Sequence, residues 1–270
     1  MSTTLERHGY GTLWTDIHTD SYESYYPNMT DYHMHDYYEI SLILSGNVHV
    51  LLSDMGESST QSKIVLLRPH TPHYIYCQPD MLYSRRNISF SADFIIDLDP
   101  HWQQLVQSFG KNGSVYKLTD SQKERYLELF NRISTETDLF RKKLLLFYLL
   151  SLITDGISEA SEFSPIPGFV TESLAYLSSH CSEKVVIRDL SDRLQIGRTT
   201  LLTAFKRYTG VTVNEYLTRC RLKNAVAMLR NGCLQQQVAE ECGFGNACGL
   251  IRSFRRIYGM TPKQYLLSTK

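Results

Sequence analysis

The six cysteines of this 270-residue chain are too scattered for a disulfide framework or a cysteine-based zinc site. None of them belongs to a Cys-x-x-Cys pair. Disulfide-dependent secreted proteins and structural zinc modules place their cysteines in clusters of that kind. The cysteine pattern therefore excludes both classes and favours the reduced environment of the cytoplasm.

Hydrophobic runs that could cross a bilayer are also missing. The longest near-continuous apolar stretch is Leu144–Ile153, which is shorter than the roughly 20 residues that a membrane-spanning helix needs. The first residues, Met1–His8, contain no apolar segment of the signal-peptide kind. We therefore expect a cytoplasmic protein without a membrane partner.

Motifs of catalysis are equally scarce. No nucleophile–base triad, phosphate-binding glycine loop or dinucleotide fingerprint is evident in the sequence. The chain is accordingly expected not to be an enzyme.

An excess of one charge sign is absent from the whole chain but present in each of its parts. The formal net charge is +0, from 28 basic and 28 acidic residues. Residues 1–170 hold 13 Lys and Arg against 21 Asp and Glu, a net of −8, whereas residues 171–270 hold 15 against 7, a net of +8. A basic C-terminal part predicts an anionic partner, of which nucleic acid is the simplest.

Residues 1–118 have the pattern of short strands separated by turns. Four segments are rich in β-branched and aromatic residues: Ile40–Leu44, Val48–Leu52, Lys63–Leu67 and Tyr74–Tyr76. Many short strands at this spacing predict an all-β sandwich or jelly-roll barrel.

A helical segment and a linker follow. Ser121 and Glu124 have the spacing of a capping box, which would start a helix. A second helix, at about residues 137–155, has a broad apolar face. The whole segment, residues 119–157, either packs on the barrel or supports a homodimer. Residues 158–168 are rich in proline and serine and predict a linker.

The most specific feature is a repeat within the last hundred residues. Two apolar anchors, a basic pair, a glycine, a threonine and a final Tyr-Leu recur after 49 residues (250 − 201) with every spacing kept. The first copy is Leu201, Phe205, Lys206, Arg207, Gly210, Thr212, Tyr216 and Leu217, and the second is Leu250, Phe254, Arg255, Arg256, Gly259, Thr261, Tyr265 and Leu266.

Each copy belongs to a helix–turn–helix unit, at about residues 187–208 and 236–258. A short amphipathic helix is followed by a turn and by a second helix whose anchors face inward at i and i+4. Gly197 in the first turn and Gly243 in the second are expected to allow a positive φ at little cost. Asn214–Leu229 predicts one long helix between the units.

These residues resemble the AraC/XylS family of bacterial transcription regulators. The resemblance covers about residues 170–268, and its most specific strings are Ala239–Phe244 and Phe254–Tyr265. It implies that residues 169–270 form an all-helical domain whose two reading helices enter successive major grooves. Double-stranded promoter DNA is then the expected partner, together with RNA polymerase.

Position along the two reading helices selects the residues expected to contact DNA. Residues placed for base edges are Arg198, Thr199, Thr200, Thr203, Asn246, Ala247 and Arg252. Basic residues placed for phosphates are Lys206, Arg207, Arg255 and Arg256. Arginine can read guanine, and asparagine adenine, through paired hydrogen bonds.

A second pattern lies in the N-terminal part. The spacing of His33, His35 and Glu39, with His73 downstream, is similar to that of the two cupin motifs. In metal-binding cupins such residues converge inside a barrel on a divalent metal ion. Three interpretations stay open here: a metal site, a pocket for an organic effector, and a structural role within the barrel.

The combined prediction is a two-domain transcriptional regulator. An N-terminal cupin-like jelly-roll barrel plus helices would sense a small molecule, such as a sugar or a related metabolite. A C-terminal tandem helix–turn–helix domain would bind DNA, and the dimeric protein would activate transcription. The main alternative is a cupin metalloenzyme that uses His33, His35, Glu39 and His73. A DNA-binding protein without an effector is the third hypothesis.

Overall fold

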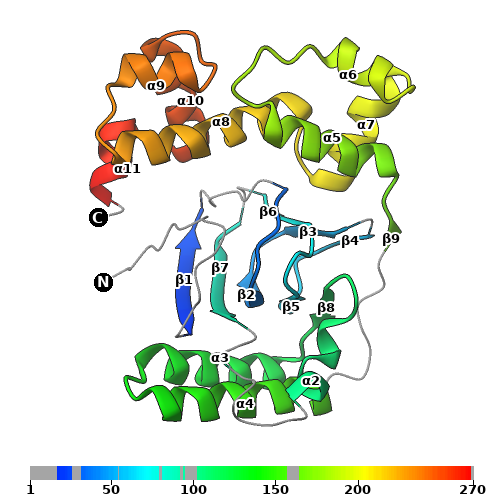
Figure 1. Ribbon diagram of the computed structural model, residues 1–270, viewed down its shortest axis with the longest axis vertical. Coiled ribbons are helices and arrows are strands. Elements are labelled where there is room, and N and C mark those ends of the chain that lie inside the picture. Colours follow the sequence, from blue (N-terminus) through cyan, green and yellow to red (C-terminus); the bar gives the residue numbers. More distant parts are fainter. Residues whose placement is uncertain are drawn as a thin grey trace. The chain divides into compact units, whose positions relative to one another are not determined.

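The computed structural model describes residues 17–25, 32–53, 55–78, 81–91, 94, 102–156 and 164–268 (Figure 1). The chain divides into two compact units, and the boundary in the second half of the sequence lies between Ser164 and Pro165. The first unit is rich in strands, and the second is helical from α5 onward. Within the described ranges, no helix has the length and apolar character needed to traverse a lipid bilayer.

The strands of the described residues form two sheets. One has the order β1-β7-β2-β5-β8 and the other the order β6-β3-β4-β9. The bounds are β1 His18–Ser24, β2 Tyr38–Ser45, β3 Val48–Leu52, β4 Met55–Ser59, β5 Lys63–Leu67, β6 His73–Cys77, β7 Tyr83–Phe90, β8 Ser114–Lys117 and β9 Ser164–Pro165. The pairs β1–β7, β7–β2, β2–β5, β5–β8 and β3–β4 are antiparallel. The sequence prediction of a jelly-roll-like fold is confirmed.

The five-stranded sheet has one apolar and one polar face because side chains alternate along a strand. Alternate residues of the central strands, among them Ile40, Leu42, Ile88 and Phe90, belong to a core that also includes the buried faces of the helices. These helices are α2 Trp102–Leu105, the 3₁₀ helix η1 Gln107–Phe109, α3 Asp120–Thr135 and α4 Leu139–Gly156. Figure 1 shows α3 and α4 side by side in the first unit.

Helix α3 starts two residues earlier than the capping-box pattern indicated. Thr119 is the N-cap, with extended backbone, and its Oγ1 accepts a hydrogen bond from the Gln122 backbone N–H at 3.3 Å. Gln122 Oε1 accepts in return from the Thr119 N–H at 3.0 Å. Ser121 therefore lies inside the first turn, and the predicted pairing with Glu124 is wrong. Threonine and glutamine supply the same reciprocal geometry as serine and glutamate.

Helix α4 buries one face and exposes another. Leu146, Leu149, Leu150 and Ile153 are fully buried in the core of the first unit. On the other face Phe140 is 61% exposed, and Leu144 and Tyr148 are each 49% exposed. The helix thus carries more apolar surface than its own unit covers.

The second unit contains the two predicted helix–turn–helix units and the helix that joins them (Figure 1). Its helices are α5 Gly168–Ser179, α6 Ile187–Arg193, α7 Arg198–Thr209, α8 Val213–Arg230, α9 Gln235–Glu241, α10 Ala247–Tyr258 and α11 Pro262–Ser268. The repeated anchors Leu201, Phe205, Leu250 and Phe254 are completely buried. Identical spacing in the two copies therefore reflects identical packing of α7 and α10.

The tight turn of the first helix–turn–helix unit differs from the prediction. Gly197 has a φ of −65°, so it does not use the conformational freedom of glycine, and the positive φ of 55° falls on Gln195. In the second helix–turn–helix unit Gly243 has a φ of +75°, as predicted. Gln195 and Gly243 are equivalent, because each follows the small residue of its unit, Ser191 or Ala239, by four positions.

We expect Gln195→Gly to raise the free energy of unfolding of the second unit by about 0.5–1 kcal/mol. Left-handed backbone costs a residue with a Cβ roughly 1–2 kcal/mol, and the greater freedom of glycine in the unfolded chain offsets part of the gain. Urea denaturation followed by circular dichroism measures the change. Gln195→Ala, which keeps the Cβ, is the control, and equal stabilities of the two variants would contradict the assignment.

Candidate DNA interface and candidate effector site

The residues expected to contact DNA lie on the exposed side of α7 and α10. Their buried anchors occupy the opposite side of the same helices. Exposed side chains are Arg198, Thr199, Thr200, Thr203, Lys206, Arg207, Asn246, Arg252, Arg255 and Arg256, and Ala247 is half-buried. The structure thus leaves both sets accessible to a duplex, while their contacts with bases and phosphates stay predictions.

Asn246 has a structural role that sequence position did not reveal. It is the N-cap of α10, and its Oδ1 accepts a hydrogen bond from the Gly249 N–H at 2.9 Å. Gln236 Oε1 adds an acceptor 3.4 Å from the Ala247 N–H. A bidentate contact with adenine uses both polar atoms of the Asn246 amide, and one of them, Oδ1, already accepts from the first turn of α10. Base reading by Asn246 would therefore share this oxygen with the helix cap.

Arg256 also has a partner within the protein. Its Nη2 donates to Thr218 Oγ1 of α8 at 3.2 Å. Arg255, the other member of this basic pair, is equally exposed in the last turn of α10. Arg256 therefore ties α10 to the joining helix, whereas Arg255 is the member of the pair that we expect to make the phosphate contact.

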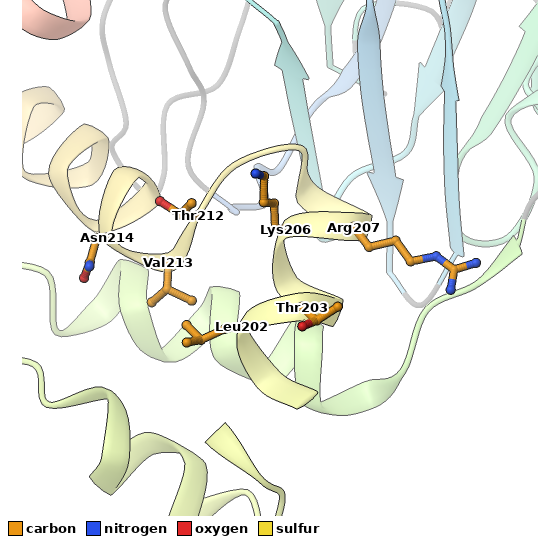
Figure 2. Close-up of a pocket in the computed structure, with 7 residues that line it drawn as sticks. All are labelled: Leu202, Thr203, Lys206, Arg207, Thr212, Val213 and Asn214. Atoms are coloured by element: carbon orange, nitrogen blue, oxygen red, sulfur yellow. The ribbon is translucent and has the colours of Figure 1, made fainter. Parts of the chain in front are cut away.

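An open hollow of about 680 Å³ lies between α7 and the start of α8 (Figure 2). Its lining consists of Leu202, Thr203, Lys206, Arg207, Thr212, Val213 and Asn214. In Figure 2 the side chains of Lys206 and Arg207 extend from α7 in different directions. The hollow thus combines the basic pair of α7 with the N-terminus of an 18-residue helix, α8.

The N-terminus of α8 adds positive electrostatic potential beside the basic pair, a feature that the sequence pattern did not predict. Thr212 is the N-cap and accepts from the Glu215 N–H at 3.2 Å. The first N–H groups of a helix have no acceptor within the helix, and the helix dipole makes this end positive. Together with Lys206 they form a site suited to an anion such as a DNA phosphate. The repeated threonine of the sequence was the signal that could have identified it.

The first unit carries a polar patch on the sheet face opposite its helices. Asp20 of β1, Asn87 of β7 and Ser41 of β2 are paired across three strands in one row. In the neighbouring row Tyr22 of β1 is paired with Arg85 of β7. Strand register therefore gathers carboxylate, amide, hydroxyl and guanidinium groups from distant parts of the sequence.

Glu39 is the centre of this polar patch. Its Oε1 accepts from the Ser41 hydroxyl at 2.9 Å and lies 3.4 Å from Asn87 Nδ2. Its Oε2 lies 3.4 Å from His35 Nε2. The His35 ring is stacked on Tyr37 and meets the His73 ring edge-on, with centroids 4.9 Å apart. Three of the four residues expected from the cupin-like spacing, His35, Glu39 and His73, are thus brought together, and His33 is assigned to the other compact unit.

Two histidines of this patch bear on the metal interpretation. The Nδ1 atoms of His35 and His73 lie 2.9 and 2.8 Å from the backbone oxygens of Tyr37 and Thr71, so Nε2 is the ring nitrogen that each would have to direct at a metal. In the part of the chain that the structure describes, no group of three His, Cys, Asp or Glu side chains is arranged to hold a metal. Ligands for a divalent ion would have to point their free lone pairs at one position.

The Glu39 carboxyl is held in its charged form. Burial by itself raises its pKa, but the hydrogen bond with His35 and the charges of His35, His73 and Arg85 outweigh burial, so the pKa is well below its usual value. A carboxyl with a lowered pKa stabilises the fold above the unfolded-state pKa and loses that contribution as the pH falls toward the folded-state pKa.

Glu39→Gln should lower the free energy of unfolding of the first unit by about 1–3 kcal/mol at neutral pH, because buried donors lose a charged acceptor. The difference from wild type should shrink as the pH falls below 4.5, the ordinary pKa of the carboxyl. Urea denaturation followed by tryptophan fluorescence measures the change, because Trp102 packs on the apolar core of the first compact unit. A difference that grows on acidification would contradict the assigned role of Glu39.

Comparison with known proteins follows the same division. A helix-turn-helix domain family matches residues 190–268, and the AraC-like ligand binding domain family matches residues 20–150. The chain is 27% identical to the HTH-type transcriptional activator RhaS of Pectobacterium carotovorum, over 86% of this chain and 85% of that protein. It is 24% identical to RhaR of an Enterobacter species, over 90% and 89%. A crystal structure of ToxT from Vibrio cholerae O395 shares 16% identity, with 93% and 97% covered and a TM-score of 0.41.

A ligand-binding domain joined to a helix–turn–helix domain defines a transcriptional regulator that binds DNA and a small molecule. The chain belongs to the AraC family of such regulators. Its relatives are transcription regulators, and none of these findings supports the alternative of a cupin metalloenzyme.

Proposed function

We propose that the protein is a cytoplasmic, effector-responsive activator that reads a bipartite promoter element with α7 and α10. The observation that carries the proposal is the pair of exposed basic reading helices held in one compact unit. Two such helices dock on DNA at elements about one helical turn apart. RNA polymerase is the further partner that an activator needs. The names of the relatives RhaS and RhaR support the assignment as an activator.

Base reading by the first helix–turn–helix unit is tested with Arg198→Ala. Loss of a bidentate contact should relax the preference at one base pair at a cost of about 1–3 kcal/mol. Affinities for a library of single-base variants of a selected duplex measure it. A uniform loss over the library would assign Arg198 to the DNA backbone instead.

The effector of the first unit is proposed to be an uncharged molecule rich in hydroxyl groups, such as a sugar, and not a metal ion. Asp20 and Glu39 offer acceptors, Asn87 and Arg85 offer donors, and the rings of Tyr22 and Tyr83 lie 6.1 Å apart nearby. Directed donors and acceptors beside aromatic rings suit the polar edges and apolar faces of such a molecule. The cupin-like description of the barrel is part of this proposal and rests on the two-sheet fold.

Ligand binding is tested by thermal shift of the full chain against panels of sugars, amino acids, fatty acids and divalent metal salts. A stabilising sugar whose effect disappears in Asn87→Ala supports the proposal. Ser58, an exposed residue of β4, provides the control variant Ser58→Ala. Stabilisation by a fatty acid or a metal salt, and by no sugar, would overturn the proposed effector class.

Homodimer formation through α4 is proposed on the exposed apolar side of that helix. Phe140, Leu144 and Tyr148 follow one another at intervals of four residues, so they share one face. Exposed apolar patches of this kind mark interfaces. Leu144→Glu should convert the dimer to a monomer in analytical ultracentrifugation, whereas Arg141→Glu, at an exposed position of the same helix, should not. A monomeric wild-type protein would overturn the proposal.

A further inference from the structure

A junction connects the loop before the first helix–turn–helix unit with the turn of the second one. It consists of residues 181–183 after α5, Arg221 and Asn224 of α8, and the turn of the second unit at Gly243. All of these residues belong to the second compact unit. The loop 181–183 leads into α6, the first helix of the first helix–turn–helix unit.

Arg221 holds this loop with two hydrogen bonds. Its Nε donates to the backbone oxygen of Cys181 at 2.6 Å, and its Nη2 donates to the backbone oxygen of Glu183 at 2.8 Å. Asn224, one turn further along α8, places its Nδ2 3.3 Å from Cys181 Sγ. A guanidinium offers a planar, forked set of donors that lysine cannot reproduce, so the loop is fixed in position and orientation.

Gly243, in the turn of the second helix–turn–helix unit, is part of the same junction. A Cβ at this position would lie 2.7 Å from the backbone oxygen of Ser182 and 3.1 Å from Arg221 Nε. The turn of the second helix–turn–helix unit therefore packs directly on the loop that precedes the first one, without space for a side chain. At the equivalent position of the first helix–turn–helix unit the chain tolerates Gln195, which shows that the turn conformation alone does not demand glycine.

The geometry of the junction bears on the spacing of the reading helices. If α8 were the sole connection, bending at either end of this helix would change the distance between α7 and α10. A second connection, which ties the loop before α6 to the turn before α10, removes that freedom. We infer that Arg221 is a positioning residue that fixes α7 relative to α10 and thereby sets the spacing of the two DNA elements that the protein accepts. This inference rests on the proposed bipartite reading.

The test measures affinity as a function of element spacing. A duplex is selected from a random pool by wild-type protein, and derivatives carry one or two base pairs more or fewer between the elements, or one element alone. Wild type should prefer one spacing. Arg221→Lys, which keeps the charge, should bind that spacing about tenfold more weakly, in line with the strength of hydrogen bonds to a charged donor. Its affinity for altered spacings and for a single element should be unchanged, so that the spacing profile flattens.

Two further variants separate positioning from general destabilisation. Gly243→Ala, which forces the turn away from Ser182, should flatten the profile in the same way. Arg230→Gln, at an exposed position in the last turn of the same helix, should keep the wild-type profile. Circular dichroism checks that each variant is folded.

The outcomes distinguish the inference from the function on which it rests. An unchanged spacing profile in both Arg221→Lys and Gly243→Ala, or an equal loss at every spacing, would overturn the positioning role while bipartite reading stands. A wild-type protein that selects a single element would overturn the bipartite reading itself.

Discussion

Phe254→Ala should abolish bipartite DNA binding and leave only the weaker binding of the first helix–turn–helix unit. Phe254 is fully buried, and its ring lies 5.3 Å from that of Tyr258 and 5.8 Å from that of Tyr265. Truncation of a buried phenylalanine costs about 3–5 kcal/mol. The small core that α10 shares with α8, α9 and α11 would lose the packing of this ring, so α10 would no longer present its arginines together.

Affinities for one-element and two-element duplexes measure this effect. Phe254→Leu, which retains most of the buried volume, is the matched control and should keep the preference for two elements. Phe205→Ala is expected to remove the other half of the preference, because Phe205 is the equivalent anchor of α7 and is equally buried. Retention of the two-element preference in Phe254→Ala would mean that the second unit does not contribute to reading.

The double variant Lys206→Ala/Arg207→Ala should bind all DNA sequences more weakly and with a smaller salt dependence. Both residues line the hollow beside the N-terminus of α8. Each phosphate contact contributes about 0.9 to the slope of log affinity against log salt, so the slope should fall by about two. Removing two contacts should also weaken binding by one to two orders of magnitude at low salt.

The measurement is a salt titration of binding to a specific and to a random duplex. Lys184→Ala, a basic residue outside both reading helices, is the control and should keep the wild-type slope. A slope that stays unchanged in the double variant would remove Lys206 and Arg207 from the phosphate contacts, and the hollow would lose its proposed role.

The helical unit was predictable from sequence because its signals are local. The anchors recur at helical spacing, and Gly210 and Gly259 end α7 and α10 with φ angles of 80° and 70°. The errors concern single positions. Gln195, rather than Gly197, takes the positive φ, and no feature of the glutamine side chain marks it for that conformation in the sequence.

The polar patch of the first unit was only partly predictable. His35, Glu39 and His73 were identified from their spacing, but Ser41, Asn87 and Arg85 were not. The pairing of β2 with β7, which are more than 30 residues apart in sequence, brings Asn87 to Glu39 and the charge of Arg85 within electrostatic reach of it. Strand register depends on the complete hydrophobic pattern and on turn geometry, and neither can be deduced from one strand. The same holds for Arg221, whose partners are backbone oxygens of a distant loop.

Helices α7 and α10 are expected to read two DNA elements as one rigid pair. Selection of duplexes from a random pool by the full-length protein, followed by sequencing of the bound fraction, tests this expectation. We expect a bipartite consensus with elements about one helical turn apart, and loss of the second element when the selection is repeated with Phe254→Ala. A single conserved element for the wild-type protein, unchanged in that variant, would show that the two helices do not read DNA as a pair.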